Sequence, residues 1–277
     1  MRNLSIGGRR AAFTARDRMD FLLEFARVQA RACAFGALLL TLMLLTHLWY
    51  PPGWPHRYDL LFATALAFQV FLVLSKRESG RETLVIVLFH LLATAMEVFK
   101  TSEAVGAWRY PEEFVLGVGN VPLFAGFMYG AVGSYLARIW CRFDFRFSGW
   151  PAAAPTLLAA AAIYANFFTH HYMADLRIAL LLWVAVLFRR TRVYYRIGPR
   201  RHSMPLLLGW LLVAFFIWLA ENLATLAHVW IYPGQEAGWR LVAPGKLPAW
   251  FLLMIVSFVL VALVKTPRKL NGQACRG

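Results

Sequence analysis

Two glutamates inside long apolar segments are the residues best suited to chemistry. Glu97 lies about 21 Å, and Glu221 about 25 Å, along the helices predicted to contain them, at a rise of 1.5 Å per residue. Both positions fall in the outer third of a hydrocarbon core about 30 Å thick. A carboxylate there is costly, and is a functional candidate when it faces the interior of a helical bundle. Such a group could act as an acid near neutral pH.

Each glutamate is followed by the same short pattern. Glu97 precedes Trp108-Arg109-Tyr110-Pro111 and Gly119-Asn120-Val121-Pro122, and Glu221 precedes Trp230-Ile231-Tyr232-Pro233 and Gly245-Lys246-Leu247-Pro248. In both copies a W-x-Y-P turn leads to G-x-x-P at the start of another apolar segment. The junctions at 46–50 and 169–172 also resemble each other. We therefore predict an internal duplication with halves at about 32–140 and 152–264.

Other polar side chains are predicted to join the glutamates in a pocket that opens toward the outer face. Glu97 and Glu221 are the predicted catalytic or ligand-orienting groups. The predicted ligand-binding residues are His90, Trp108, Tyr110, Asn120, Tyr164, Asn166, His170, His171, Asn222, Trp230 and Tyr232. The alternative is that Glu97 pairs with Lys100, while Glu221 and Asn222 only hydrogen-bond neighbouring helices.

The sequence predicts no metal and no cofactor. His170 and His171 are adjacent, so on a helix their side chains point about 100° apart and only one can join a shared site. No H-E-x-x-H spacing, phosphate loop, nucleophile elbow or dinucleotide fingerprint occurs. The three cysteines are scattered at no ligand spacing: Cys33, Cys141 and Cys275.

The composition is that of a membrane protein, with 60% hydrophobic residues, eleven Trp and a mean hydropathy of +0.55. A spanning helix needs about 20 mostly apolar residues. Eight such runs occur, at roughly 32–50, 58–75, 83–100, 122–140, 152–169, 174–188, 204–231 and 247–264. We predict an all-α bundle of eight transmembrane helices over residues 32–265. A basic arm at 1–31 precedes it, and a tail at 266–277 follows. The amphipathic pattern in the arm predicts either a helix that lies on the membrane or a simple leader into the first span.

Basic residues alternate between the two sides of this predicted bundle. Of 29 Lys and Arg, 23 fall in the arm, the tail and every second connection, and 6 fall in the others. Because excess Lys and Arg marks the cytoplasmic face, both termini are predicted inside a bacterial inner membrane. Four crossings in each half make the duplication a parallel repeat. The net charge of +15 is therefore assigned to contact with anionic lipid headgroups, and nucleic acid is not an expected partner.

Longer motifs carry a resemblance to a known family. They are Met96-Glu97, Trp108-x-Tyr110-Pro111, Val121-Pro122 with the following Leu-Phe-x-Gly-Phe-Met-Tyr, the stretch 164–172 and the stretch 216–222. Over about residues 20–265 the sequence resembles the YoaT-like bacterial integral membrane proteins, a family of unknown function. The resemblance implies a multi-pass membrane protein and no particular reaction.

A more distant similarity is to the membrane lycopene cyclases and carotenoid hydratases. Those enzymes also repeat a W-x-Y turn before a proline-led helix, and they protonate a polyene with buried carboxylates. They carry acidic residues just after that proline, whereas Leu123 and Ala249 follow it here. The similarity therefore implies acid chemistry only through Glu97 and Glu221.

Three functions remain open from the sequence. The first is a membrane enzyme or binding protein for a lipophilic, isoprenoid-like small molecule. The second is a proton-coupled transporter that uses the same carboxylates as proton sites. The third is a structural or assembly factor in which the glutamates only fasten helices.

Overall fold

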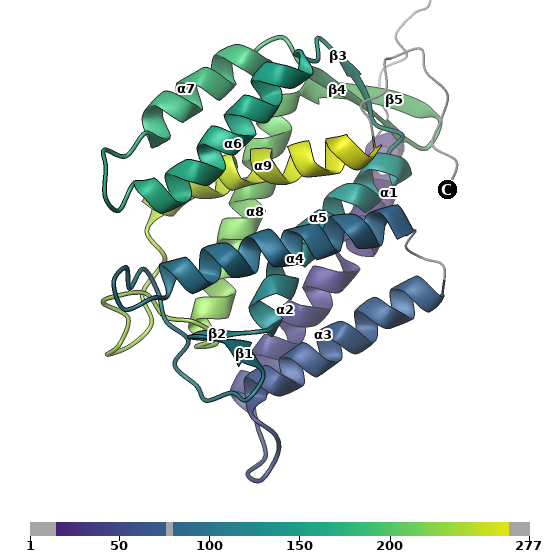
Figure 1. Cartoon of the computed structure of the whole chain (residues 1–277). Helices are drawn as coiled ribbons and strands as arrows, with labels where there is room; N and C mark the ends of the chain where they lie inside the picture. The colour runs from purple at the N-terminus through teal and green to yellow at the C-terminus, as the bar shows by residue number, and fades with distance from the viewer. Residues whose placement is uncertain (1–14, 76–79, 266–277) are drawn as a thin grey trace, which may run out of the picture.

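The computed structural model describes residues 15–75 and 80–265 (Figure 1). Predictions for residues 1–14, for the tail and for Cys275 concern residues outside this described part. Its helices are α1 (Ala15–Ala32), α2 (Ala34–Leu48), α3 (Arg57–Leu74), α4 (Gly80–Lys100), α5 (Phe124–Arg142), α6 (Ala153–Thr169), α7 (Arg177–Phe188), α8 (Leu206–Leu226) and α9 (Leu247–Lys265), with a 3₁₀ turn at Pro244–Lys246. Helices α2 to α9 coincide with the eight apolar runs.

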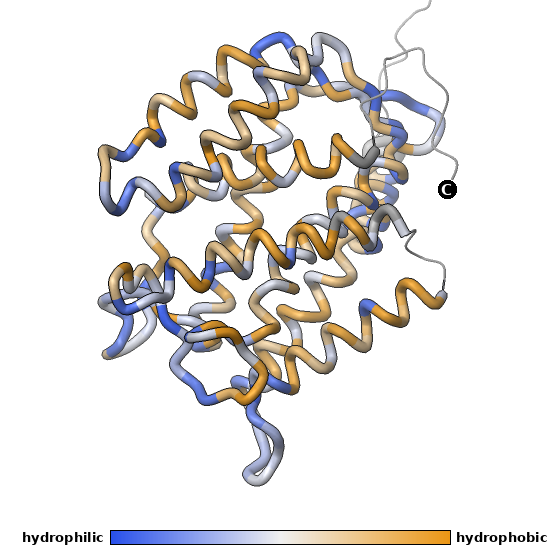
Figure 2. The backbone as a smooth tube through the Cα atoms, in the orientation of Figure 1, coloured by the Kyte–Doolittle hydropathy of each residue, from blue (hydrophilic) through white to orange (hydrophobic). Residues whose placement is uncertain are grey.

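These eight helices run back and forth between two ends of the molecule (Figure 1). One end carries the end of α3, the start of α4 and a sheet of β3, β4 and β5. The other end carries the hairpin of β1 and β2 and the α8–α9 loop. Hydrophobic positions follow the helices, and hydrophilic ones gather at both ends (Figure 2). Among the described residues, α3, α8 and α9 with its preceding turn are each long and apolar enough to span a membrane. The pair α1–α2, bent by 71°, could form a fourth span. The count of eight spans and the orientation of the ends stay predictions.

The amphipathic pattern in the basic arm is confirmed as a helix, α1. Its Phe21 ring lies 4.8 Å from the ring of His202, and its Phe25 ring lies 5.7 Å from that of Phe143. Both partners belong to the end of the molecule that carries β3, β4 and β5. The helix therefore packs against the rest of the fold, and its placement on a membrane surface stays a prediction.

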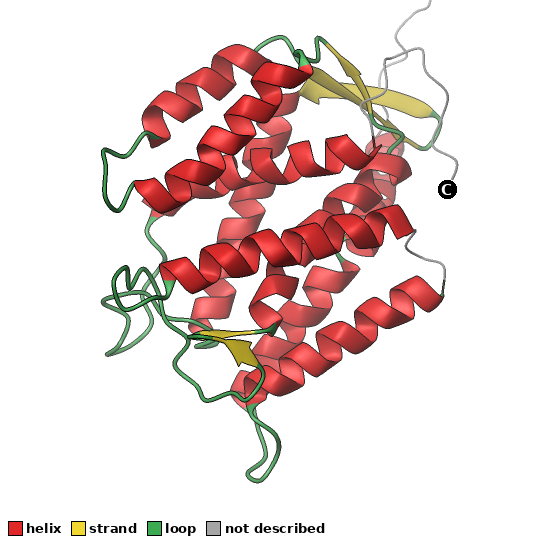
Figure 3. Ribbon diagram, in the orientation of Figure 1, coloured by secondary structure: helices red, strands yellow, loops and turns green. Residues whose placement is uncertain are grey.

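The predicted helical fold is confirmed in its main part, and two small antiparallel sheets that were not predicted lie at opposite ends of the helices (Figure 3). Strands β1 (Gly117–Val118) and β2 (Val121–Pro122) pair in one, and β3 (Arg146–Ser148), β4 (Arg192–Ile197) and β5 (Arg200–Pro205) form the other in the order β3-β4-β5. In β4, buried Val193 and Ile197 alternate with exposed arginines, as in a strand with one covered face. Gly198, at φ +55°, supplies the positive φ of the β4–β5 turn.

Helix α5 packs closely against α4 through three glycines. A Cβ atom on Gly126 would lie 2.3 Å from Nδ1 of His90, and one on Gly133 would lie 2.9 Å from the Phe89 ring. At Gly130 the nearest atom, in Ile86, would be 3.2 Å away. The absence of side chains at these positions lets the two helices approach. This contact holds the last turn of α4, which contains Glu97, beside the first turns of α5.

Candidate functional site

Glu97 lies at the end of α4 and is only 2% exposed. Its Oε2 accepts hydrogen bonds of 2.8 Å from Nε1 of Trp108 and 2.8 Å from the hydroxyl of Tyr110. Its Oε1 accepts a bond of 2.7 Å from the hydroxyl of Tyr129 on α5. These donors are neutral side chains, so the alternative in which Glu97 pairs with Lys100 is wrong.

Glu221 has a matching environment at the end of α8. It is also 2% exposed. Its Oε1 accepts a hydrogen bond of 2.5 Å from the hydroxyl of Tyr232, and its Oε2 accepts one of 2.5 Å from Nε1 of Trp250 on α9. In each half the carboxylate therefore binds the tyrosine of the W-x-Y-P turn and an aromatic donor on the next helix. Trp230 instead packs beside the hydrophobic cluster around Tyr58.

The two W-x-Y-P turns meet at equivalent positions. Arg109 and Ile231 exchange two backbone hydrogen bonds of 3.0 Å in an antiparallel bridge. Trp108 and Tyr232 lie together on one side of this bridge, with their rings 6.1 Å apart edge to face. The Tyr129 and Trp250 rings lie 6.4 Å apart. Aromatic rings thus link the two glutamates. We name the carboxylate cluster as Glu97, Trp108, Tyr110, Tyr129, Glu221, Tyr232 and Trp250.

His170 and His171 lie beside Lys100, not beside Glu97. The Nζ of Lys100, a residue 4% exposed, is 2.7 Å from Nε2 of His171 and 3.3 Å from Nε2 of His170. Nδ1 of His170 is 2.7 Å from the carbonyl oxygen of Asn166. A carbonyl only accepts, so Nδ1 carries the proton and Nε2 accepts from Lys100. Burial, the charge of Lys100 and the neighbouring His170 lower the pKa of His171 to about 4, so its ring is neutral at pH 7. We name these three residues the Lys100 cluster.

The remaining predicted residues make contacts between helices or between helices and loops. Asn166 accepts from a backbone amide at 3.1 Å, and Asn222 accepts from another at 2.8 Å. Asn120 and Tyr164 each donate to a backbone carbonyl, at 3.3 Å and 2.9 Å. His90 packs its ring against α5, and its Nδ1 has no hydrogen-bond partner among the described residues. These five residues therefore lie near the predicted site without joining the carboxylate cluster.

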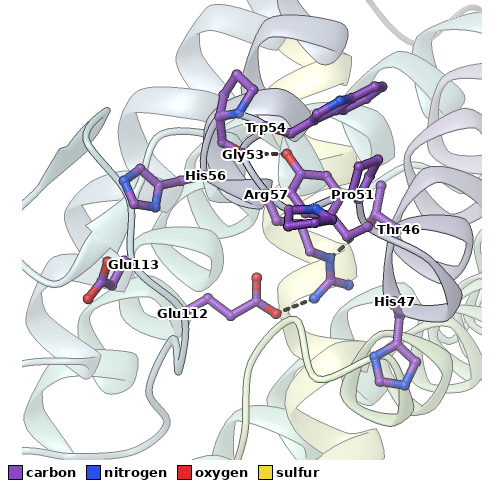
Figure 4. A pocket seen from close by; sticks show the side chains of 12 residues that line it. Thr46, His47, Pro51, Gly53, Trp54, His56, Arg57, Glu112 and Glu113 are labelled. Atoms are coloured by element: carbon purple, nitrogen blue, oxygen red, sulfur yellow. Dashed lines mark hydrogen bonds and ion pairs between the residues drawn. The ribbon is translucent and has the colours of Figure 1, made fainter.

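Sequence reasoning missed Arg57, at the start of α3, which it counted only as a charge. Arg57 is 6% exposed, and its Nη2 donates to the carbonyls of Met43 and Ala227 at 2.9 Å each. Its Nε donates to Thr46 Oγ1 at 2.9 Å, and its Nη1 pairs with Glu112. The side chains of Arg57 and Glu112 point toward each other, and both line a cavity of about 450 Å³ (Figure 4). Residues 46–47, 50–57 and 112–113 line this cavity, and the predicted site residues are not among them. The available signal was that Arg57 is the one basic residue in its connection, on the side of the predicted bundle that has few basic residues.

The apolar helices and the fold define a mostly helical membrane protein. The profile of DUF817, a protein family of unknown function, matches residues 21–258, and the chain belongs to this family. The chain is 42% identical to the uncharacterized protein YoaT of Bacillus subtilis (strain 168) over 244 residues, which is 88% of this chain and 91% of YoaT. The family predicted from the motifs is confirmed.

Two solved structures have a similar fold. A cross-linked MvINS trimer is 16% identical, with a TM-score of 0.50, over 71% of this chain and 98% of that chain. MvINS, an Insig homologue from Mycobacterium vanbaalenii, is 16% identical, with a TM-score of 0.49, over 69% of this chain and 98% of that chain. At this identity, the first similarity concerns the fold alone.

Proposed function

We propose that the protein binds a lipophilic small molecule at the end of the bundle that contains the carboxylate cluster. One observation carries the proposal: two buried carboxylates, one from each half of the sequence, each fix aromatic side chains that meet at the same place. Rigid aromatic faces suit an apolar, isoprenoid-like ligand, and a few fixed polar groups suit its orientation.

In this proposal Glu97 and Glu221 orient the binding residues. Their four carboxylate oxygens all accept hydrogen bonds from the aromatic side chains, and each glutamate is 2% exposed. Proton transfer to a substrate would first have to break one of these bonds. An orienting role therefore has more support than acid catalysis, and the acid chemistry implied by the similarity to lycopene cyclases stays a prediction from sequence.

Ligand carried through purification tests the proposal. We expect the full chain, extracted from its native membrane, to retain a lipophilic compound that mass spectrometry detects above a mock extract. The variants Glu97→Gln and Glu221→Gln should retain less of it, whereas Glu103→Gln, an exposed carboxylate shortly after α4, should retain as much as the original. Size-exclusion profiles separate loss of ligand from loss of fold. A chain that carries no compound, or carries it equally in all variants, would contradict the proposal.

Proton-coupled transport is the second candidate. Its support is that the carboxylates are linked through hydroxyl-bearing rings between α5 and the α8–α9 loop, beside the bridge about which the two halves could rock. It predicts uptake into proteoliposomes driven by a pH gradient. If Glu221→Gln left that uptake unchanged, this candidate would fail.

A structural or assembly role is the third candidate. Its support is that the carboxylate oxygens have aromatic partners, as expected of groups that fasten helices. It predicts that Glu97→Gln and Glu221→Gln lower the unfolding temperature and change nothing in the lipid profile of cells. A changed lipid profile at unchanged protein abundance would count against it.

We further propose the predicted topology: arm 1–31, membrane domain 32–265 as two parallel halves, and tail 266–277, with both termini at the cytoplasmic face of a bacterial inner membrane. Exposed arginines on the β4–β5 hairpin support contact between this face and anionic lipid headgroups. A single cysteine at position 200 should react with impermeant maleimide only after the cells are opened, and one at position 53 should react in intact cells. The reverse pattern would overturn the orientation.

A further inference from the structure

We infer that the Lys100 cluster, with Lys246, binds the acidic head of the ligand, a phosphate or a carboxylate. The inference rests on the proposed binding function and adds the chemical class of the ligand. It follows from a buried ammonium with unused hydrogen-bonding capacity, from a second ammonium nearby, and from carboxylates that are already occupied.

Lys100 is a buried charge with incomplete hydrogen bonding. Its ammonium has three N–H groups, and the neutral rings of His170 and His171 accept two of them. Within the described part of the chain, no carboxylate oxygen forms an ion pair with Lys100. A lysine buried without an anion is costly, so its neighbours must offset that cost or a bound anion must do so.

Lys246 places a second positive charge over the ring of Trp108, which is hydrogen-bonded to Glu97 on the same turn of α4 as Lys100. Its Nζ lies 3.9 Å from the centre of the Tyr232 ring and 5.9 Å from that of Trp108. It is close enough to Lys100 for their charges to repel each other, and Arg177 repels both. Like charges held together in a partly buried place favour the binding of an anion.

The carboxylates whose charges act on these two lysines, Asp175 and Glu221, are already hydrogen-bonded to other residues. Asp175 accepts a hydrogen bond of 2.5 Å from Nε of Arg177 and another of 3.3 Å from Asn166. Glu221, which attracts Lys246, has both oxygens bound by aromatic side chains. The two ammonium groups therefore retain donors for an oxyanion that comes from outside the protein.

The position of Lys246 connects this anion site to the apolar one. Its ammonium covers two rings of the carboxylate cluster, so a head bound to it would leave the rest of the ligand beside those rings. His171 is exposed and contacts Nζ of buried Lys100, so it lies on the side from which an anion can approach. An oxyanion that takes the place of His171 would bind Lys100, and the charge of Lys246 would attract it further. The occupant is thus an acidic amphiphile.

Matched pairs of ligands test the inference with the full chain in neutral detergent. Oleate is compared with oleyl alcohol, and phosphatidic acid with the diacylglycerol of the same acyl chains, by quenching of tryptophan fluorescence and by native mass spectrometry. The acidic member of each pair should bind about tenfold more tightly or better, because one charge-assisted hydrogen bond is worth about that factor. Lys100→Met and Lys246→Met should each remove most of this preference. Arg240→Met, which removes an exposed charge from the same loop as Lys246, should keep it.

Each other outcome identifies which statement fails. Equal affinity for acidic and neutral members, unchanged in Lys100→Met, would overturn the inference and leave the proposed function standing. No binding of any member would overturn both. Inorganic phosphate that binds as tightly as phosphatidic acid would assign the site to a free anion and overturn the amphiphile. Should Lys100→Met fail to fold, Lys246→Met carries the same expectation, because Lys246 is not fully buried.

Discussion

Removing one hydroxyl tests whether the carboxylate cluster is as tightly bonded as its geometry indicates. Tyr129→Phe keeps the ring and deletes the donor to Oε1 of Glu97, while Oε2 keeps its two donors. Because Glu97 is 2% exposed, water cannot easily take the place of the lost donor. A hydrogen bond to a charged group contributes about 1.5–3 kcal/mol, so we expect the free energy of unfolding to fall by about 2 kcal/mol. In a domain near this size that lowers the unfolding temperature by about 4–8 °C.

A second tyrosine on the same helix provides the control. The hydroxyl of Tyr135 donates to Oε1 of Gln29 at 3.0 Å, a neutral and half-buried acceptor that water can reach. Tyr135→Phe should therefore cost about 1 kcal/mol or less. Both variants are purified in one detergent, and their unfolding is followed by tryptophan fluorescence at one heating rate, because membrane-protein unfolding is often irreversible.

The double variant shows which bond carries the loss. In a chain that already carries Glu97→Gln, Tyr129→Phe should lower the free energy of unfolding by less than it does alone, because the acceptor is no longer charged. If Tyr129→Phe cost no more than Tyr135→Phe, or if the two changes at Glu97 and Tyr129 were additive, the hydrogen bond to Oε1 would not stabilise the fold as argued.

Three further predictions concern other parts of the structure. Arg57→Lys should lower the free energy of unfolding by about 2–4 kcal/mol, because lysine cannot reproduce the forked hydrogen bonds to α2 and to the end of α8. In the same chemical-denaturation series, Arg240→Lys at an exposed position should change the free energy of unfolding by no more than about 0.5 kcal/mol. Gly126→Ala should destabilise by about 1–3 kcal/mol, since its Cβ would lie 2.3 Å from a facing ring nitrogen. Gly36→Ala, with its nearest contact at 3.7 Å, should stabilise, and the reverse order of the two unfolding temperatures would refute the packing argument. The pKa of His171 is about 4 in the folded chain, against its ordinary 6.5, so the unfolded state binds a proton first as the pH falls. The free energy of unfolding should therefore decrease between about pH 6.5 and 4. His171→Gln should make this decrease smaller, and an unchanged decrease would exclude a contribution from His171.

The helices could be predicted because long apolar runs have one stable form in a lipid environment. Helices α2 to α9 lie where those runs lie, and the differences are at their ends. The seventh predicted span reached residue 231, whereas α8 ends at Leu226, because the W-x-Y-P turn follows it. The second sheet was missed because arginines at the exposed positions of β4 make the strand look like a charged loop. Its pairing of 146–148 with 192–194 depends on contacts distant in the sequence.

The candidate site was predicted in part. Hydropathy alone locates two buried carboxylates, but it does not identify their partners. The Trp and Tyr residues of the turns are typical of a membrane boundary, so their hydrogen bonds to the glutamates could not be separated from that role. The spacing of Glu97 and Lys100 favoured a salt bridge on one helix. Neutral donors from a loop and from α5 take the carboxylate instead, and only the fold brings them there.

The bridge between Arg109 and Ile231 limits how the two halves of the chain can move. It joins the second residues of the two W-x-Y-P motifs by two backbone hydrogen bonds, so the two halves of the sequence cannot separate at that point without breaking both bonds. A rocking motion that preserves them would use the bridge as its fulcrum. The two halves of the chain would then move least beside the glutamates and most at the opposite end of the molecule, next to β3, β4 and β5.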